Sequence, residues 1–155
     1  REDGSSGIEA ADLSDWAGKK AGGGAGTQYM KIAEKQGAEP VIYDNVTNDV
    51  YLRDVSTGRT DFIPNDYFTQ VMAIQWVKSN FPDIKVKMGD AQYNPTEQGI
   101  VMSKSDDSLK EKLDETIEAM KADGTLKAIS EKYYGGQDLT VPVENADELP
   151  VIDVE

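Results

Sequence analysis

The chain has 155 residues, of which 29 are acidic and 16 are Lys or Arg, and its formal net charge is −13. Such an acidic surface repels nucleic acids and anionic membranes, so we expect neither as a partner. Cys and His are absent, which excludes thiol and Ser-His catalysis and the usual zinc sites, and no apolar run is long enough to span a membrane.

Residues 1–11 are polar and rich in Gly and Ser, which predicts a linker or a crossing segment. The chain opens without an initiator Met or a signal peptide, so we expect it to be a piece of a longer protein. A strand is predicted near 19–24. A glycine-rich turn follows it, and then a helix that Thr27 caps and Gly37 ends.

Strands and helices then alternate along the chain, which favours an α/β fold with an open, mostly parallel sheet covered by helices. The predicted elements are a strand at 41–43, a helix between Thr47 and Gly58, a strand at 60–64, a helix at 67–80 and a strand at 84–88.

The C-terminal third is predicted to hold a strand at 99–102 and two helices separated by Gly124. The first of these helices is amphipathic. The last stretch, 136–155, is acidic and contains no Lys or Arg, so we expect an extended, loosely attached tail. The apolar face of the amphipathic helix consists of Leu109, Leu113, Ile117 and Met120.

The turn Gly26-Thr27-Gln28 is a candidate site for a small anion such as a carboxylate. Glycines allow close approach of a ligand to the backbone, and the first amides of the following helix point outward at the positive end of its dipole. The alternative is a strand-to-helix turn that only packs closely. The residues alone leave the two interpretations equally weighted.

A second candidate is Asn65-Asp66-Tyr67, directly after the strand predicted at 60–64. A carboxylate followed by an aromatic ring suits an ammonium group, although Asp66 could equally serve only as the N-cap of the next helix. One of Tyr67 and Phe68 is expected in the core. Ligands bind outside the carboxyl ends of parallel strands, so these two strand ends could together hold the opposite charges of an α-amino acid.

Several short motifs occur in order between residues 12 and 135, and together they resemble one family. The motifs are Gly26-Thr27, Gly58-Arg59-Thr60-Asp61, Asn65-Asp66, Asp123-Gly124-Thr125-Leu126 and Lys132-Tyr133-Tyr134-Gly135. With them the sequence resembles the amino-acid-binding proteins of ABC importers, the family 3 extracellular solute-binding proteins, which have the type II periplasmic binding fold.

The resemblance implies a clamp of two lobes that closes on a free amino acid. Residues 1–11 would be a hinge crossing, 12–98 the second lobe, 99–135 a return strand and helices of the first lobe, and 136–155 a tail. Thr27 and the Gln28 amide would bind the α-carboxylate, and Asp66 the α-ammonium. Gly24 and Asn65 would lie near the ligand side chain, which we expect to be polar and, as a first hypothesis, cystine-like.

The resemblance also implies partners and location. The expected partners are a free amino acid and ABC permease subunits, in an extracellular lipoprotein or a periplasmic protein without cofactor or catalytic residues. An enzyme similar to cyclohexadienyl dehydratases and a sensor domain are the alternatives. Most of the first lobe would be missing, so we expect millimolar or no binding by these 155 residues, and a second copy is a candidate cover for the exposed helices.

Overall fold

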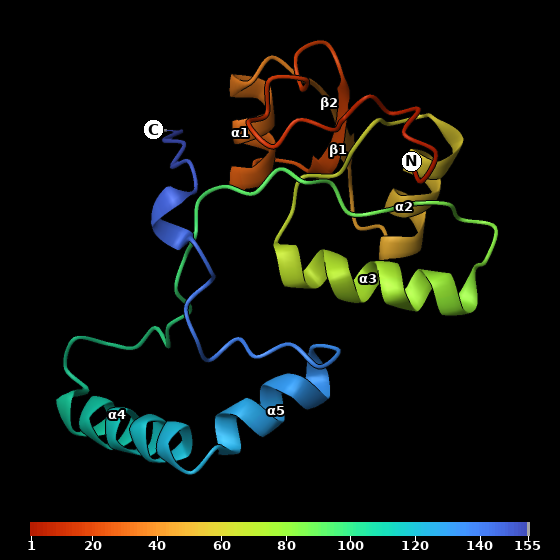
Figure 1. The fold of residues 1–155 in the computed structure, drawn as a ribbon. Coiled ribbons are helices and arrows are strands. Elements are labelled where there is room, and N and C mark those ends of the chain that lie inside the picture. The colour runs from red at the N-terminus through yellow and green to blue at the C-terminus, as the bar shows by residue number, and fades with distance from the viewer. Residues whose placement is uncertain (155) are drawn as a thin grey trace. The chain divides into compact units, whose positions relative to one another are not determined.

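The computed structural model describes residues 1–154, which form two compact units. The first unit consists of Arg1–Asn94 together with the C-terminal residues from Pro150, and the second is Pro95–Leu149 (Figure 1). The predicted lobe boundaries stay a prediction. The acidic tail is not wholly loose, because Ile152 and Val154 pack against the core of the first unit, and Ile152 N donates to Asn94 Oδ1 at 2.6 Å.

The first unit is built on a small parallel sheet of β1 (Lys20–Gly24) and β2 (Glu39–Tyr43). The predicted strand at 60–64 pairs with β1 only through a single parallel bridge between Ala21 and Phe62. Pro64 follows closely and has no N–H to donate, which limits the length of that ladder. The fold is therefore α/β with a parallel sheet, as predicted, but the sheet is small.

Two other predicted strands form no ladder. At 84–88 the expected alternation is present, with Ile84 and Val86 buried and Lys85 exposed, but Lys85 N donates to the Ser56 hydroxyl instead of to a strand. At 99–102 the side chain of Val101 is 98% exposed, and no strand of the described residues lies alongside. A strand needs a paired neighbour, and neither segment has one.

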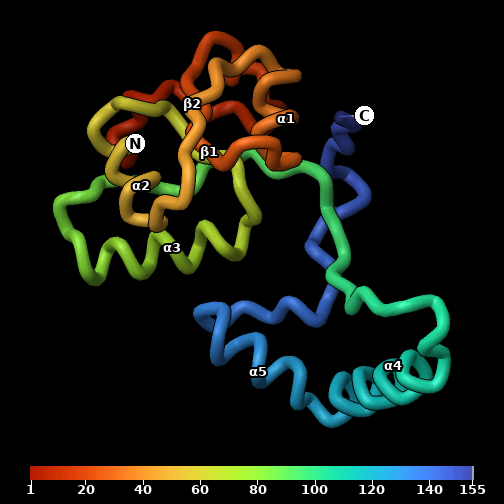
Figure 2. The backbone as a smooth tube through the Cα atoms, turned by 180° about the vertical axis from the view of Figure 1, so that it is seen from behind, coloured from red at the N-terminus to blue at the C-terminus, as the bar shows by residue number. Residues whose placement is uncertain are grey.

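The helices of the first unit are α1 (Gln28–Lys35), α2 (Asn48–Thr57) and α3 (Tyr67–Asn80). Helix α1 packs on both strands and α2 packs on α3, as Figures 1 and 2 show from opposite sides. One core cluster lies between the sheet and α1, where the Trp16 and Phe62 rings are 4.5 Å apart between centroids. A second cluster joins α2, α3 and the 84–88 segment through Leu52, Val55, Ile74, Val77, Ile84 and Val86.

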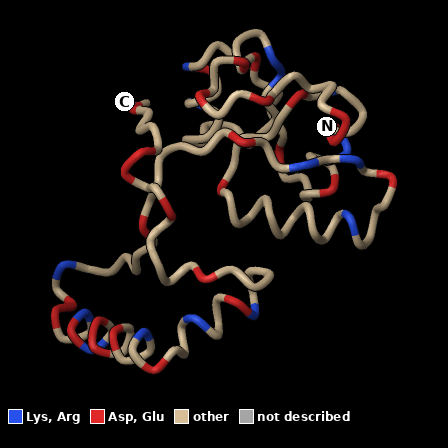
Figure 3. The backbone as a smooth tube through the Cα atoms, viewed as in Figure 1, with Lys and Arg blue, Asp and Glu red and all other residues tan. Residues whose placement is uncertain are grey.

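The second unit contains α4 (Asp107–Ala122), α5 (Thr125–Tyr133) and the short 3₁₀ helix η1 (Ala146–Glu148). Both predicted helices are present, but α4 buries no residue and α5 buries only Ser130. Acidic and basic residues recur along α4 (Figure 3), while Leu109 is 49% exposed. Among the described residues no helix is both long and apolar enough to cross a membrane.

Candidate ligand-binding site

The predicted anion site lies at the turn between β1 and α1. Gly26 has a φ of 69°, in the left-handed region, and a side-chain carbon added there would meet nothing within 4 Å. Thr27 caps α1: its Oγ1 accepts a hydrogen bond from Met30 N at 3.3 Å and donates to Gly24 O at 3.1 Å. Because the fold uses the Thr27 hydroxyl, the groups left for an anion are the first amides of α1, beginning at Gln28.

Asp66 lies at the same edge of the sheet as this turn. The parallel bridge between Ala21 and Phe62 means that the segment after Phe62 leaves the sheet where β1 ends. Asp66 Oδ1 accepts the Thr69 N–H at 2.8 Å, and Asn65 Oδ1 accepts the Asp66 N–H at 2.8 Å. The capping role is therefore confirmed. The second carboxylate oxygen of Asp66 has no hydrogen-bond partner within residues 1–154 and is available to a cation.

Electrostatics link the turn to Asp66. Burial, and then the negative charge of Asp66, raise the pKa of Tyr29, whose ring projects from the first turn of α1 and is 36% exposed. The parallel bridge between Ala21 and Phe62 is the geometric observation that brings the amide turn and the carboxylate to one edge of the sheet.

The other predicted site residues lie beside these two groups. Gly24 ends β1 and would, with a side chain, touch Thr27 at 3.4 Å. Tyr67 is 43% exposed at the start of α3, with its ring edge-on to Phe68 at 5.2 Å. The expectation that one of these two rings is a core residue was wrong, since neither is buried. Asn65 is exposed.

Two tyrosines at this edge were missed from the sequence. Tyr29 is the second residue after the Thr27 cap, so its position on the first helical turn could have identified it. Tyr93 could not be found, because its segment has no periodic pattern. Its ring packs edge-on against Trp16 at 5.6 Å, and burial followed by the nearness of Tyr29 raises the pKa of Tyr93 to about 12.

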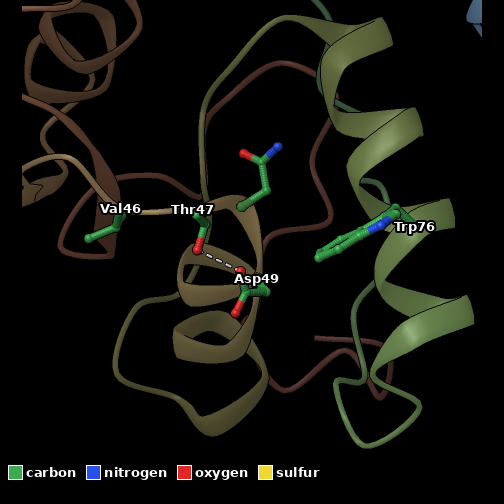
Figure 4. Close-up of a pocket in the computed structure, with 5 residues that line it drawn as sticks. Val46, Thr47, Asp49 and Trp76 are labelled. Atoms are coloured by element: carbon green, nitrogen blue, oxygen red, sulfur yellow. Dashed lines mark hydrogen bonds between the residues drawn. The ribbon is translucent and has the colours of Figure 1, made fainter.

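A separate hollow, also missed from the sequence, lies between the start of α2 and the middle of α3. It has a volume of about 430 Å³. In Figure 4 the ring of Trp76 extends from α3 toward Asp49, whose Oδ1 accepts the Thr47 hydroxyl at 2.6 Å. The lining residues are Val46, Thr47, Asn48, Asp49 and Trp76. No group of three or more acidic residues within 1–154 is arranged to hold a metal ion.

The sequence matches known proteins over most of its length. The profile of the family "Bacterial extracellular solute-binding proteins, family 3" matches residues 18–136. The probable ABC transporter extracellular-binding protein YckB of Bacillus subtilis is 42% identical over 145 residues, which are 93% of this chain and 48% of YckB. The L-cystine-binding protein TcyJ of Escherichia coli is 33% identical over 130 residues, covering 83% of this chain and 46% of TcyJ.

A third relative, the ABC transporter arginine-binding protein 1 of Escherichia coli, is 33% identical over 127 residues, which are 79% of this chain and 50% of that protein. The crystal structure of the Bacillus subtilis YckB protein superposes with a TM-score of 0.81 at 41% identity, covering 99% of this chain and 58% of that one. The chain thus spans about half the length of the curated relatives it matches.

Proposed function

The chain belongs to family 3 of the bacterial extracellular solute-binding proteins and has their type II periplasmic binding fold, and from this premise we propose that it provides one side of an amino-acid-binding site. The receptor of which this site is half would capture a free polar amino acid outside the cytoplasm and deliver it to an ABC permease. We propose binding and delivery without catalysis, in keeping with the names of its relatives.

The observation that supports this proposal is that a group of hydrogen-bond donors and a carboxylate lie at the same edge of the sheet. The first amides of α1, from Gln28 onward, are donors at the positive end of a helix dipole. Asp66 is a half-buried carboxylate, and one of its oxygens accepts no hydrogen bond from the described residues 1–154. We assign the α-carboxylate of the ligand to the turn Gly26–Gln28 and the α-ammonium to Asp66. Tyr29 and Tyr67 would border the ammonium, where an aromatic ring is favourable to a cation.

The ligand side chain would lie near Gly24 and Asn65. Gly24 has no side chain, and Asn65 is exposed and offers an amide. These two residues favour a polar side chain of some size, and named relatives bind L-cystine and arginine. We propose a ligand of this polar class, with a cystine-like amino acid as the first candidate.

The test is a thermal-shift screen of the complete receptor against the protein amino acids and cystine. A ligand that binds only the folded state stabilises it, by about 2.7 kcal/mol when its concentration is one hundred times its dissociation constant. This stabilisation raises the midpoint temperature of unfolding. We expect a shift for one polar amino acid or a small group of them. No shift with any amino acid would contradict the proposal.

A further inference from the structure

Residues 150–154, which we call the strap, return to the first unit after the chain has left it, and Asn94 holds them there. Asn94 N donates to Pro150 O at 2.9 Å. The Asn94 side chain then pairs with the backbone of Ile152 in both directions. Its Nδ2 donates to Ile152 O at 3.0 Å, and its Oδ1 accepts the Ile152 N–H at 2.6 Å. One residue thus makes three hydrogen bonds to a segment far along the sequence.

The strap is also held by apolar packing. Its side chains alternate, since Val151 is 81% exposed whereas Ile152 and Val154 are half-buried. The two half-buried side chains pack against the core cluster that contains Trp16. This pattern is typical of an extended segment that lies with one face on a core.

The strap reaches the helix that begins at the amino-acid site. Lys35, in the last turn of α1, donates its Nζ to the Asp153 carbonyl. The C-terminal end of the chain accordingly lies beside α1 in both Figure 1 and Figure 2. The strap therefore connects the place where the chain leaves the first unit with the far end of α1.

Asn94 stands at the boundary of the two units. It is the last residue of the first unit before Pro95, and Pro150 is the residue at which the chain returns. Its φ of 49° is in the left-handed region, which Asn adopts more readily than most residues. The hydrogen bond between Asn94 and Pro150 therefore brings both chain connections of the second unit to one point of the first.

The strap lies beyond the region of the chain that the family profile matches, which ends at residue 136. The pattern that defines the family therefore does not include this contact.

We propose that Asn94 is a positioning residue, which uses the strap to hold together the two chain connections of the second unit. A unit fixed at two adjacent points has fewer orientations than one that hangs on a single connection, because each added tether lowers conformational entropy. In a receptor that closes on its ligand from two sides, fewer open orientations reduce the entropic cost of closing. Asn94 thus strengthens amino-acid binding without touching the amino acid. This last step rests on the proposed function.

Two pairs of variants test the strap. Asn94→Gly keeps the left-handed backbone and removes both side-chain hydrogen bonds. Its matched control is Asn145→Gly, because Asn145 also has a left-handed φ, 59°, and its side chain makes no capping hydrogen bond. Ile152→Ala removes apolar packing of the strap, and Val151→Ala is its control at the exposed neighbouring position.

Pulsed electron paramagnetic resonance measures the spread of distances between the two units in the 155-residue chain. The chain has no Cys, so Ser79→Cys on α3 and Ser108→Cys on α4 place one spin label in each unit at an exposed position. Calorimetry of the complete receptor with L-cystine and with L-arginine measures affinity. Urea unfolding checks that every variant is folded under the conditions of both measurements.

We expect a broader distance distribution for Asn94→Gly and Ile152→Ala than for the unmutated chain, and no broadening for either control. Affinity should fall about fivefold in the two strap variants, the lower end of the range usual for coupling between separate sites. Equal widths in all five proteins would overturn the inference, and so would unchanged affinity in the strap variants. Failure of the unmutated receptor to bind either amino acid would instead contradict the proposed ligand class, and the distance distributions would then decide the inference.

Discussion

Asp66 has two roles in this account, and different substitutions separate them. Its Oδ1 caps α3 through the Thr69 amide, while its charge is assigned to the ligand ammonium. Asn is as good an N-cap as Asp, whereas Ala is not. We therefore predict that Asp66→Asn unfolds in urea close to the unmutated midpoint and that Asp66→Ala loses about 1 kcal/mol of unfolding free energy. Equal losses in both variants would mean that the charge, not the cap, stabilises the fold.

Tyr43 gives a pH-dependent prediction. Burial, and then the hydrogen bond and charge of Asp54, raise its pKa from 10.0 to about 12, and its hydroxyl donates to Asp54 Oδ2 at 2.5 Å. Between these two pKa values, the Tyr43 hydroxyl has already lost its proton in the unfolded state but still holds it in the folded state. The stability that Tyr43 provides is therefore complete below about pH 10 and is lost as the pH rises from about 10 to about 12.

The matched variant for this prediction is Tyr43→Phe, which keeps the ring and removes the ionisable hydroxyl. Urea unfolding at about pH 8 and at about pH 11 measures the difference in unfolding free energy between the two proteins. We expect the difference to shift in favour of the Phe variant at the higher pH. A difference that does not change with pH would contradict the assigned pKa.

At the scale of elements, a glycine-rich sequence suggests close approach of a ligand, but the glycines of β1 serve the packing of the core. A side-chain carbon on Gly22 would lie 2.7 Å from Ile63 Cδ1 and 2.9 Å from the Tyr43 ring. Gly23 would likewise collide with Met30. These two glycines therefore make room for core side chains and not for a ligand.

Gly22→Ala should consequently destabilise the first unit by roughly 1–3 kcal/mol, the usual cost of overpacking a core. Gly26→Ala is the contrasting variant, because nothing lies within 4 Å and only its φ of 69° opposes a side chain. Urea unfolding of both variants measures the costs. A smaller loss for Gly22→Ala than for Gly26→Ala would contradict the packing described here.

Local signals predicted the elements that depend on local chemistry. Thr27 and Asp66 as caps, and the five long helices, follow from hydrogen bonding and periodicity within a few residues. Strands at 84–88 and 99–102 were not formed, because a ladder depends on a distant partner that no local pattern specifies. The packing of Ile152 and Val154 on the first unit was missed for the same reason.

The same distinction applies to the site. Its two polar groups could be named from the residues, since a glycine turn before a cap and an acid after a strand each have a local signature. We expected both groups to lie at one edge of the sheet because its strands are parallel, and the parallel Ala21–Phe62 bridge agrees with that expectation. The burial of Tyr93 against Trp16 and the hollow between α2 and α3 depend on which distant segments meet, and the sequence did not indicate them.

At the scale of the whole molecule, one side of a binding site should bind weakly. Three or so charge-assisted hydrogen bonds contribute roughly 1.5–3 kcal/mol each, whereas association costs on the order of 4–15 kcal/mol. We predict that these 155 residues bind amino acids at millimolar strength or not at all. Isothermal titration measures this directly, and micromolar binding by the 155-residue chain would show that the first lobe is dispensable.

The most direct test of the central claim is calorimetry of the complete receptor with the ligand that the thermal screen identifies, comparing the unmutated protein with Asp66→Asn. Glu34→Gln is the matched control, because it removes the same charge from an exposed position on α1. Loss of one charge-assisted bond should weaken binding by roughly 1.5–3 kcal/mol, or about 10- to 150-fold, in Asp66→Asn alone. Equal affinity in all three proteins would contradict the assignment of the ligand ammonium to Asp66.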